Sequence, residues 1–303
     1  MKTRILLSAV TVLALAACDD PVDEFRDAAP SAQGIDVKMR GAKGQALVGD
    51  PALMPGVTAL ATFVVNGRVA LTLGTIAAVV ASRPAQVSQN EVFWGPVTRP
   101  LWRDEFTLRM TRTANGFEYV VQGRKKGSTG AFATFLTGVH RPGLAQASGE
   151  YRVDFTAMEQ NLADFHDTVG LALVRYTRTG RDVTVDIDFQ QVGNVNGAER
   201  LDSRYAFSQV EGGEGSFEFV VDSNYDAKSA ALERLTVKSR WQWDGAGRAD
   251  VIGSGGDLPA PFRFSECWDN VLNRSYYGDT LGLFPTEGSE SSCTYSEASY
   301  SRL

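Results

Sequence analysis

Residues 105–122, EFTLRMTRTANGFEYVVQ, decide the fold class. In the first half of this stretch Phe106, Leu108 and Met110 alternate with polar residues, and the half that follows Asn115-Gly116 alternates in the same way. Apolar residues at every second position lie on one face of a β-strand, and Asn-Gly between two such segments is the strongest short signal of a hairpin. The stretch therefore predicts two antiparallel strands with one buried face.

The same alternation recurs along most of the chain. Because consecutive strands joined by short turns usually pair side by side and antiparallel, the sequence predicts a mainly β fold, an antiparallel up-and-down meander. A sheet of this length is expected to curl into a barrel or half-open barrel, since closure removes exposed edges. Further strands are predicted at residues 131–139, 148–155, 169–178, 182–190, 204–210, 216–221, 235–243 and 248–252.

One to three short helices are expected beside the sheet. Residues 71–82 are rich in Ala, Leu and Val and end before Arg83-Pro84, and proline disfavours helix in the residue ahead of it. They predict a short helix, with a second strand as the alternative because Asn66-Gly67 just before them is a hairpin signal. Residues 158–166 predict another short helix.

The amino end has the pattern of a secretory signal. Lys2 and Arg4 are followed by the apolar residues 5–15 and then by small residues, which is the order of a signal peptide over residues 1–17. The apolar run is shorter than the ~20 residues that cross a bilayer.

Leu15-Ala16-Ala17-Cys18 resembles the lipobox of bacterial lipoproteins. The resemblance implies lipidation of Cys18, with diacylglycerol on its thiol, cleavage just before it, and a further acyl chain such as palmitate on the new amino terminus. It also implies a cell-envelope protein anchored to a membrane, with its domain in the periplasm or at the cell surface. Several acyl chains anchor a protein durably.

The acidic residues 18–34 predict a lipidated flexible tether, and residues 35–303 a single β-rich domain. Lipidation leaves Cys267 and Cys293 of the chain's three cysteines, and in an oxidising compartment they predict a disulfide that clamps the tail, residues 258–303. The net charge of −6 and the lack of a long basic run argue against nucleic acid as a partner.

Residues for chemistry are sparse. Neither His140 nor His166 has metal-ligand neighbours at zinc spacing, and an ordinary surface or helix-cap position is expected for both. The chain has no G-x-S-x-G motif, phosphate loop or dinucleotide-binding glycine pattern. We therefore expect no catalytic residues and no cofactor. The pair Asp186 and Asp188 is expected on a solvated strand face, and the tryptophans Trp94, Trp102, Trp241 and Trp243 in the core or lining an apolar site.

A weak calcium candidate lies after residue 221. Asp222, Asn224, Asp226 and Glu233 place oxygen atoms at the first, third, fifth and twelfth positions of a calcium loop. Ala227 stands where that loop needs glycine, so an Asp/Asn turn between strands is favoured.

The expected function is non-enzymatic binding or carriage of a hydrophobic or amphipathic ligand, an apolar small molecule or a lipid. The architecture is broadly similar to lipocalins and to envelope lipoprotein carriers with an unclosed barrel, although the chain has no motif of either family. The alternatives are an envelope scaffold or protein-interaction module without a ligand cavity, and a hydrolase.

Overall fold

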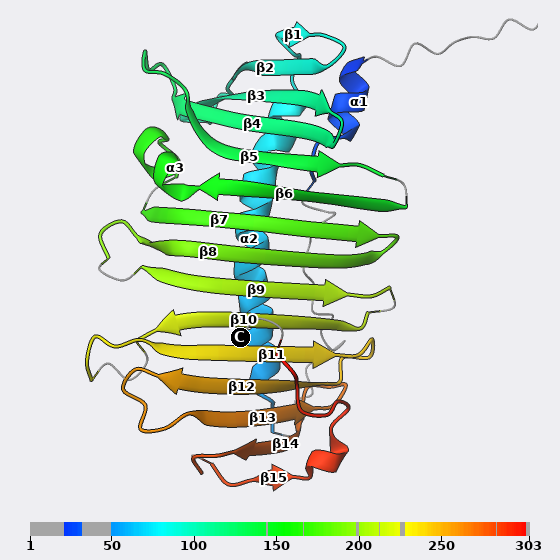
Figure 1. The fold of residues 1–303 in the computed structure, drawn as a ribbon, viewed down its shortest axis with the longest axis vertical. Coiled ribbons are helices and arrows are strands. Elements are labelled where there is room, and N and C mark those ends of the chain that lie inside the picture. The colour runs from blue at the N-terminus through cyan, green and yellow to red at the C-terminus, as the bar shows by residue number, and fades with distance from the viewer. Residues whose placement is uncertain are drawn as a thin grey trace, which may run out of the picture.

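The computed structural model describes residues 21–31 and 50–300, apart from 144, 166, 198–199, 212, 225–227 and 283 (Figure 1). Within this part of the chain fifteen strands form one antiparallel sheet, and each strand pairs with the next along the chain. The predicted meander is confirmed. The sheet does not close into a barrel, because its order runs from β1 to β15 without a pairing between these two strands.

The strands vary from short edge pieces to long central ribbons. They are β1 (Gln86–Val87), β2 (Glu91–Val97), β3 (Asp104–Thr113), β4 (Gly116–Lys125), β5 (Ala133–Arg141), β6 (Gln146–Asp154), β7 (Thr168–Thr179), β8 (Asp182–Asn194), β9 (Leu201–Gln209), β10 (Gly215–Ser223), β11 (Glu233–Trp241), β12 (Gly247–Gly255), β13 (Phe262–Trp268), β14 (Arg274–Asp279) and β15 (Glu287–Gly288).

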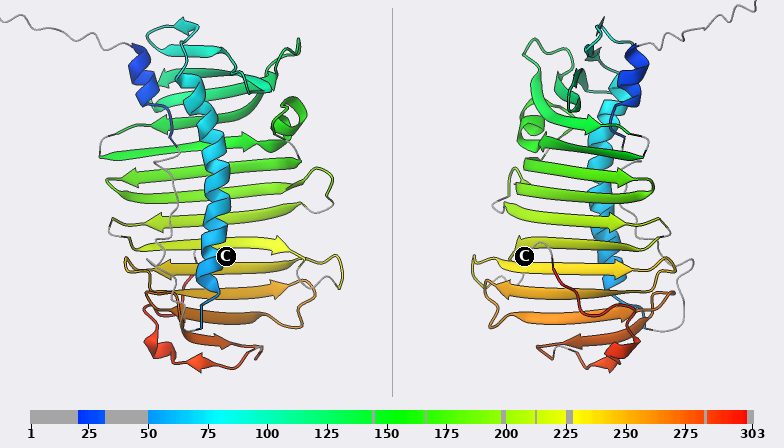
Figure 2. Two further views of the ribbon diagram at one scale, coloured as in Figure 1. Left: turned by 180° about the vertical axis from the view of Figure 1, so that it is seen from behind. Right: turned by 45° about the vertical axis from the view of Figure 1, so that its right-hand side comes forward.

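The hairpin predicted from residues 105–122 is β3 and β4. Thr113 pairs with Gly116, so the turn lies at Ala114-Asn115, one residue earlier than Asn115-Gly116. The alternating apolar residues of both strands are buried on the side of the sheet that carries α2 (Met54–Val80). We call this side the helix face and the opposite side the outer face (Figure 2).

The helix α2 corrects the prediction for residues 57–82. It is a single helix of 27 residues, where a hairpin signal followed by a short helix was expected. Met54, Thr58, Val65, Thr72 and Ile76 are buried at helical spacing on one side of it, and this tertiary packing outweighs the local signal of Asn66-Gly67. Gly67 costs only ~1 kcal/mol relative to Ala inside a helix. By length and composition alone, α2 could also cross a membrane.

Charged side chains hold both ends of α2 on the molecule. At its amino end, the backbone N–H of Met54 donates to Glu266 Oε2 over 2.7 Å, and Glu266 is buried. At its carboxyl end, Arg26 donates to the carbonyl of Val80 and Arg99 to that of Ala78, each at 3.2 Å. A carboxylate near the first turn and arginines near the last satisfy the unpaired backbone groups and complement the helix dipole.

The helix face carries a nearly continuous apolar row. Cross-strand neighbours from β3 to β13 follow one another beneath α2, and burying such a row supplies the main driving force for folding. The row consists of Met110, Tyr119, Gly138, Tyr151, Val174, Ile187, Tyr205, Phe219, Val237, Val251 and Phe264.

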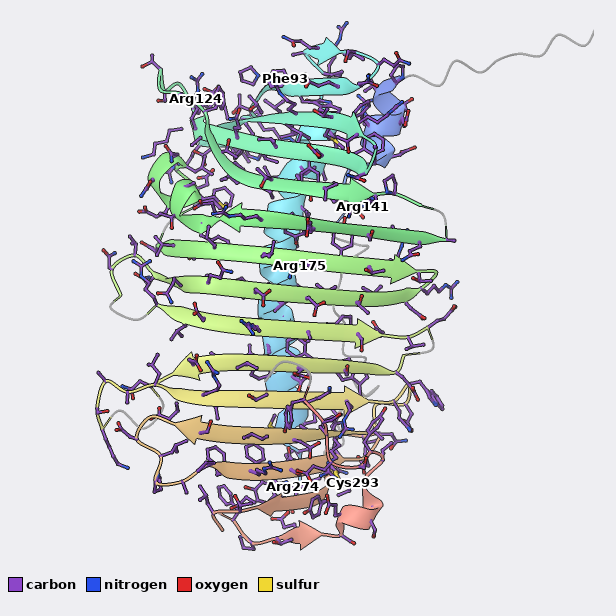
Figure 3. The ribbon with its side chains drawn as sticks, in the orientation of Figure 1. Phe93, Arg124, Arg141, Arg175, Arg274 and Cys293 are labelled. Atoms are coloured by element: carbon purple, nitrogen blue, oxygen red, sulfur yellow. A yellow bond between two sulfur atoms is a disulfide. The ribbon has the colours of Figure 1, made fainter. Side chains whose placement is uncertain are left out.

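The outer face is charged. Arg175 lies within 3.7 Å of Glu150 and 3.4 Å of Asp188 (Figure 3), and Asp188 also pairs with Arg204. The pair Asp186 and Asp188 therefore lies on the polar face, as predicted.

The carboxyl-terminal residues are only partly a tail. β13 and β14 continue the sheet, and the chain then crosses the outer face as a strap, residues 289–300, joined to β13 by the predicted disulfide Cys267–Cys293. Arg248, which is 1% exposed, lies beneath the strap and donates to Asp250 and Glu290. Polar contacts thus fix the strap where a tail on a barrel was expected.

Two other helices are short. α1 (Pro21–Asp27) packs Phe25 edge-on against Phe117 at 5.2 Å between ring centroids, so this part of the predicted flexible tether is folded. α3 (Phe155–Asn161) begins earlier than predicted because Asp154 accepts from the N–H of Ala157 and caps the helix.

Candidate ligand-binding site

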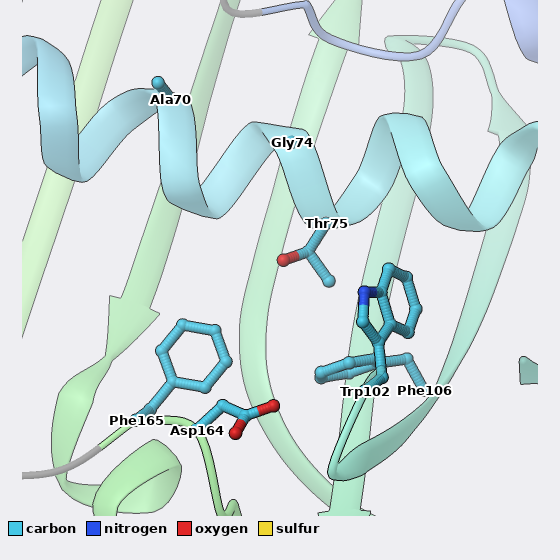
Figure 4. Close-up of a pocket in the computed structure, with 7 residues that line it drawn as sticks. All are labelled: Ala70, Gly74, Thr75, Trp102, Phe106, Asp164 and Phe165. Atoms are coloured by element: carbon cyan, nitrogen blue, oxygen red, sulfur yellow. The ribbon is translucent and has the colours of Figure 1, made fainter. Parts of the chain in front are cut away.

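A cavity of about 340 Å³ opens beside α2, where β3 and the segment after α3 approach it (Figure 4). Its volume is at the lower end of the range for small-molecule sites, ~300–1,000 Å³. Most of its walls are apolar, and Asp164 is the titratable lining residue. The lining residues are Ala70, Gly74, Thr75, Trp102, Phe106, Asp164 and Phe165.

The cavity exists because α2 presents small residues to it. A Cβ atom added at Gly74 would meet nothing within 4 Å. Opposite the helix, Trp102 and Phe106 pack edge to face with 5.5 Å between their ring centroids. A rigid aromatic wall facing a helix without large side chains leaves room for an apolar chain.

Asp104 fixes the third wall. Its buried carboxylate accepts from the N–H groups of Ala163 and Asp164 at 2.6 and 2.9 Å. Asp164 in turn accepts from the N–H of Arg103 at 3.2 Å and lies 3.7 Å from its guanidinium group. The segment after α3 is therefore tied to the start of β3, and the one carboxylate of the cavity already has a cationic partner.

A narrower crevice lies directly beneath α2. It holds about 10 Å³, roughly the room of one water molecule. Its walls are apolar except for Thr72 and the hydroxyl of Tyr151, so the helix and the sheet nearly touch here. It is lined by Val65, Thr72, Tyr151, Val153, Phe155, Ala172, Val174, Ile187 and Phe189.

Four aromatic residues form a buried polar cluster on the helix face. His140 Nδ1 and the Tyr176 hydroxyl lie 2.5 Å apart. The hydroxyls of Tyr119 and Tyr151 are buried without a hydrogen-bond partner among the described residues. Burial raises the pKa of Tyr119, Tyr151 and Tyr176, and burial followed by the charge of Arg178 lowers the pKa of His140. The surface position expected for His140 is wrong.

Two glycines make space for this cluster. A Cβ atom at Gly138 would lie 2.5 Å from the Tyr119 hydroxyl, and one at Gly149 would lie 2.5 Å from the Tyr176 hydroxyl. Glycine inside a strand often marks such a close approach, so the two glycines are a sequence signal from which the cluster could have been inferred, although it was not predicted.

The tryptophans divide between core and cavity. Trp94 and Trp241 are fully buried and Trp102 lines the cavity. Trp243, which was also expected in the core or lining an apolar site, lies beyond the end of β11 and is 68% exposed.

The calcium candidates are engaged with protein groups. Asp222 forms a two-point ion pair with Arg234, at 2.7 Å for each bond. Asn224 donates to the carbonyl of Ser229, and Glu233 accepts from the N–H of Asp257 at 2.8 Å. Asp226 lies outside the described residues. In the described part of the chain no group of three or more His, Cys, Asp or Glu side chains could hold a metal ion.

Two further predicted residues, Cys18 and His166, also lie outside the described residues. Comparisons of the chain with models of protein families, with curated proteins and with solved structures find no match.

Proposed function

We propose that this protein is a membrane-anchored envelope lipoprotein, without catalytic activity of its own, that binds or carries a hydrophobic or amphipathic ligand in the cavity beside α2. The observation that carries the proposal is this open, mostly apolar cavity of about 340 Å³ at the edge of a long apolar sheet face. Burying a ligand's apolar surface there would contribute ~25 cal/mol per Å².

The unclosed sheet supports this function. The helix α2 lies along the apolar face of the unclosed sheet (Figure 2), and the cavity opens beside it. Mostly apolar walls with two polar lining residues, Thr75 and Asp164, suit a ligand with an apolar chain and a polar head.

A pair of substitutions on α2 tests the proposal. Thr75 points toward Trp102 and Phe106 across the cavity (Figure 4), so Thr75→Phe places a ring in the cavity, whereas Gly67→Phe places the same ring on the solvent side of the helix. Neither change is expected to unfold the helix, because Phe and Thr have similar helix propensities and glycine is less favourable than either.

The readout is displacement of a fluorescent fatty acid from the purified chain. We expect Thr75→Phe to weaken fatty-acid binding at least tenfold and Gly67→Phe to leave it unchanged. Equal binding by both variants, or no binding by the parent chain, would contradict a ligand site in this cavity.

A protein-interaction module is the second candidate. Leu60 and Phe63 on the solvent side of α2 are 65% and 75% exposed, and adjacent exposed apolar side chains are typical of contact surfaces. A photo-crosslinking residue at position 63, used in intact envelopes, should then yield one defined adduct with another protein. Only the uncrosslinked chain would be recovered if this surface has no partner.

A further inference from the structure

A basic and apolar loop lies at the mouth of the cavity. In this loop, residues 98–103, Leu101 is 94% exposed, whereas Trp102 turns inward to line the cavity. Arg99 lies over the Trp102 ring, with its guanidinium carbon 5.1 Å from the ring centroid. Two adjacent residues of the loop therefore face opposite ways, Leu101 into the solvent and Trp102 into the cavity.

Two lysines extend the positive surface of the loop. The N–H of Lys126 donates to the carbonyl of Arg103 at 2.9 Å, and Lys126 Nζ donates to the carbonyl of Arg99 at 3.3 Å. Lys125 is its neighbour, and both lysines are exposed, as are Arg99 and Arg103. Four exposed cations thus lie on the loop of Leu101 and on the end of β4 that adjoins it.

The nearby carboxylates cancel this charge only in part. Asp164 pairs with Arg103 at 3.7 Å, whereas Glu105 pairs with a different arginine, Arg124, at 2.6 Å. Arg99 and the two lysines keep the loop positive on a chain whose net charge is −6. An exposed apolar side chain with cations on the same loop and on the adjoining strand end matches an anionic bilayer, because the apolar group enters the acyl region while the cations meet lipid phosphates.

The position of α1 places the proposed anchor at the same end of the sheet's long axis as this loop, although α1 packs at the opposite end of β3. α1 packs on β4 through Phe25 and Phe117, and Arg112 forms an ion pair with Glu24. α1 therefore lies at the same end of the sheet as β2 and β3 (Figure 1). Pro21 follows Cys18 by three residues, which span at most ~11 Å. Lipid on Cys18 would hold this end of the sheet at the bilayer.

We propose that residues 98–103, with Lys125 and Lys126, dock on an anionic phospholipid surface, with Leu101 inserted and the cavity mouth turned toward the bilayer. The surface adds a membrane contact to the proposed function. It rests on the membrane anchor of that function but not on the carriage of a ligand, since the loop contacts lipid whether or not the cavity is filled.

The test is a depth measurement on the full chain, purified from membranes and reconstituted into vesicles of phosphatidylcholine with or without phosphatidylglycerol. A polarity-sensitive dye is attached at Leu101→Cys, or at Leu281→Cys near the opposite end of the sheet, where Leu281 is 41% exposed. Quenching of the dye by lipids brominated near the headgroup is recorded, with the parent chain as blank. The amino end is held to the bilayer by the Cys18 lipid or by a retained apolar segment, so the readout does not require lipidation.

We expect severalfold stronger quenching at position 101 than at position 281, in vesicles that contain phosphatidylglycerol. Lys125→Gln combined with Lys126→Gln should reduce the quenching at position 101, because it removes two positive charges while the glutamine amide at position 126 keeps a hydrogen-bond donor. Equal quenching at the two positions would overturn the proposal, as would quenching at position 101 that ignores both phosphatidylglycerol and the lysine substitutions. Fatty-acid binding is measured separately, so failure of the carrier function would not be mistaken for failure of docking.

Discussion

Glu266→Ala is predicted to release the amino end of α2 from the sheet. Glu266 is 1% exposed, accepts from the N–H of Met54 at 2.7 Å, and pairs with Arg274 at 2.8 Å. Loss of the charged bond to Met54 costs ~1.5–3 kcal/mol. Loss of a partner inside a buried ion pair costs ~3–5 kcal/mol. Arg274 is 25% exposed and keeps its ion pair with Glu287 at 3.1 Å. Because solvent and Glu287 compensate its charge, we take about a third of that cost for the lost pair. The expected loss of unfolding free energy is therefore ~3–5 kcal/mol.

The assay for Glu266→Ala combines urea unfolding, followed by circular dichroism, with hydrogen exchange of the first turns of α2. Glu266→Gln keeps an acceptor for Met54 and should lose about half as much. Glu287→Gln is the matched control, because it removes the more exposed partner of Arg274 and should cost less than ~1 kcal/mol. A loss below ~1 kcal/mol for Glu266→Ala, with unchanged exchange in α2, would refute the view that this carboxylate holds the helix.

Three further predictions concern the strap, the polar cluster and its glycines. Cys267→Ser combined with Cys293→Ser opens a loop of sequence separation 26 and should lower the unfolding free energy by ~3 kcal/mol; full retention of stability in urea would show that the polar contacts alone hold the strap. Burial lowers the pKa of His140 below 6.5 in the folded chain, so its contribution to stability is present above that pH and is lost as the pH falls and the unfolded chain takes up the proton. The parent chain should therefore lose more stability than His140→Gln between about pH 7.5 and about pH 5.5, and parallel pH profiles would contradict this reasoning. At Gly138 an added Cβ atom would lie 2.6 Å from the carbonyl oxygen of Glu150, so Gly138→Ala should cost ~1–3 kcal/mol, whereas Gly67→Ala should stabilise; a neutral Gly138→Ala would show that the strands can separate there.

The strands were predicted well from the sequence where apolar residues alternate with polar ones without interruption. In β3 and β4 the alternation of Phe106, Leu108 and Met110 is undisturbed, and the structure has the hairpin within one residue. β13 was not predicted, because its buried face includes Glu266, whose charge breaks the apolar alternation. Glu266 is buried there because it bonds to Met54 and pairs with Arg274. Met54 is distant from it in sequence, so a local pattern could not show this contact.

The helix and the cavity were harder to predict for a related reason. Asn66-Gly67 is a hairpin signal in isolation, and only the sheet beneath α2 makes a long helix favourable there. The cavity is lined by residues from three segments, 70–75, 102–106 and 164–165, and it depends on side chains that are small. Absence of a side chain leaves no pattern along a sequence, so the site could be found only in three dimensions.

The most direct test of the ligand-carrier account is native mass spectrometry of the full chain, purified from bacterial envelopes in a mild detergent. The account predicts a bound species of lipid-sized mass on the parent chain and on Gly67→Phe, and its loss from Thr75→Phe. A clean mass for the parent chain, unchanged after incubation with added lipid, would contradict the account and favour the interaction module.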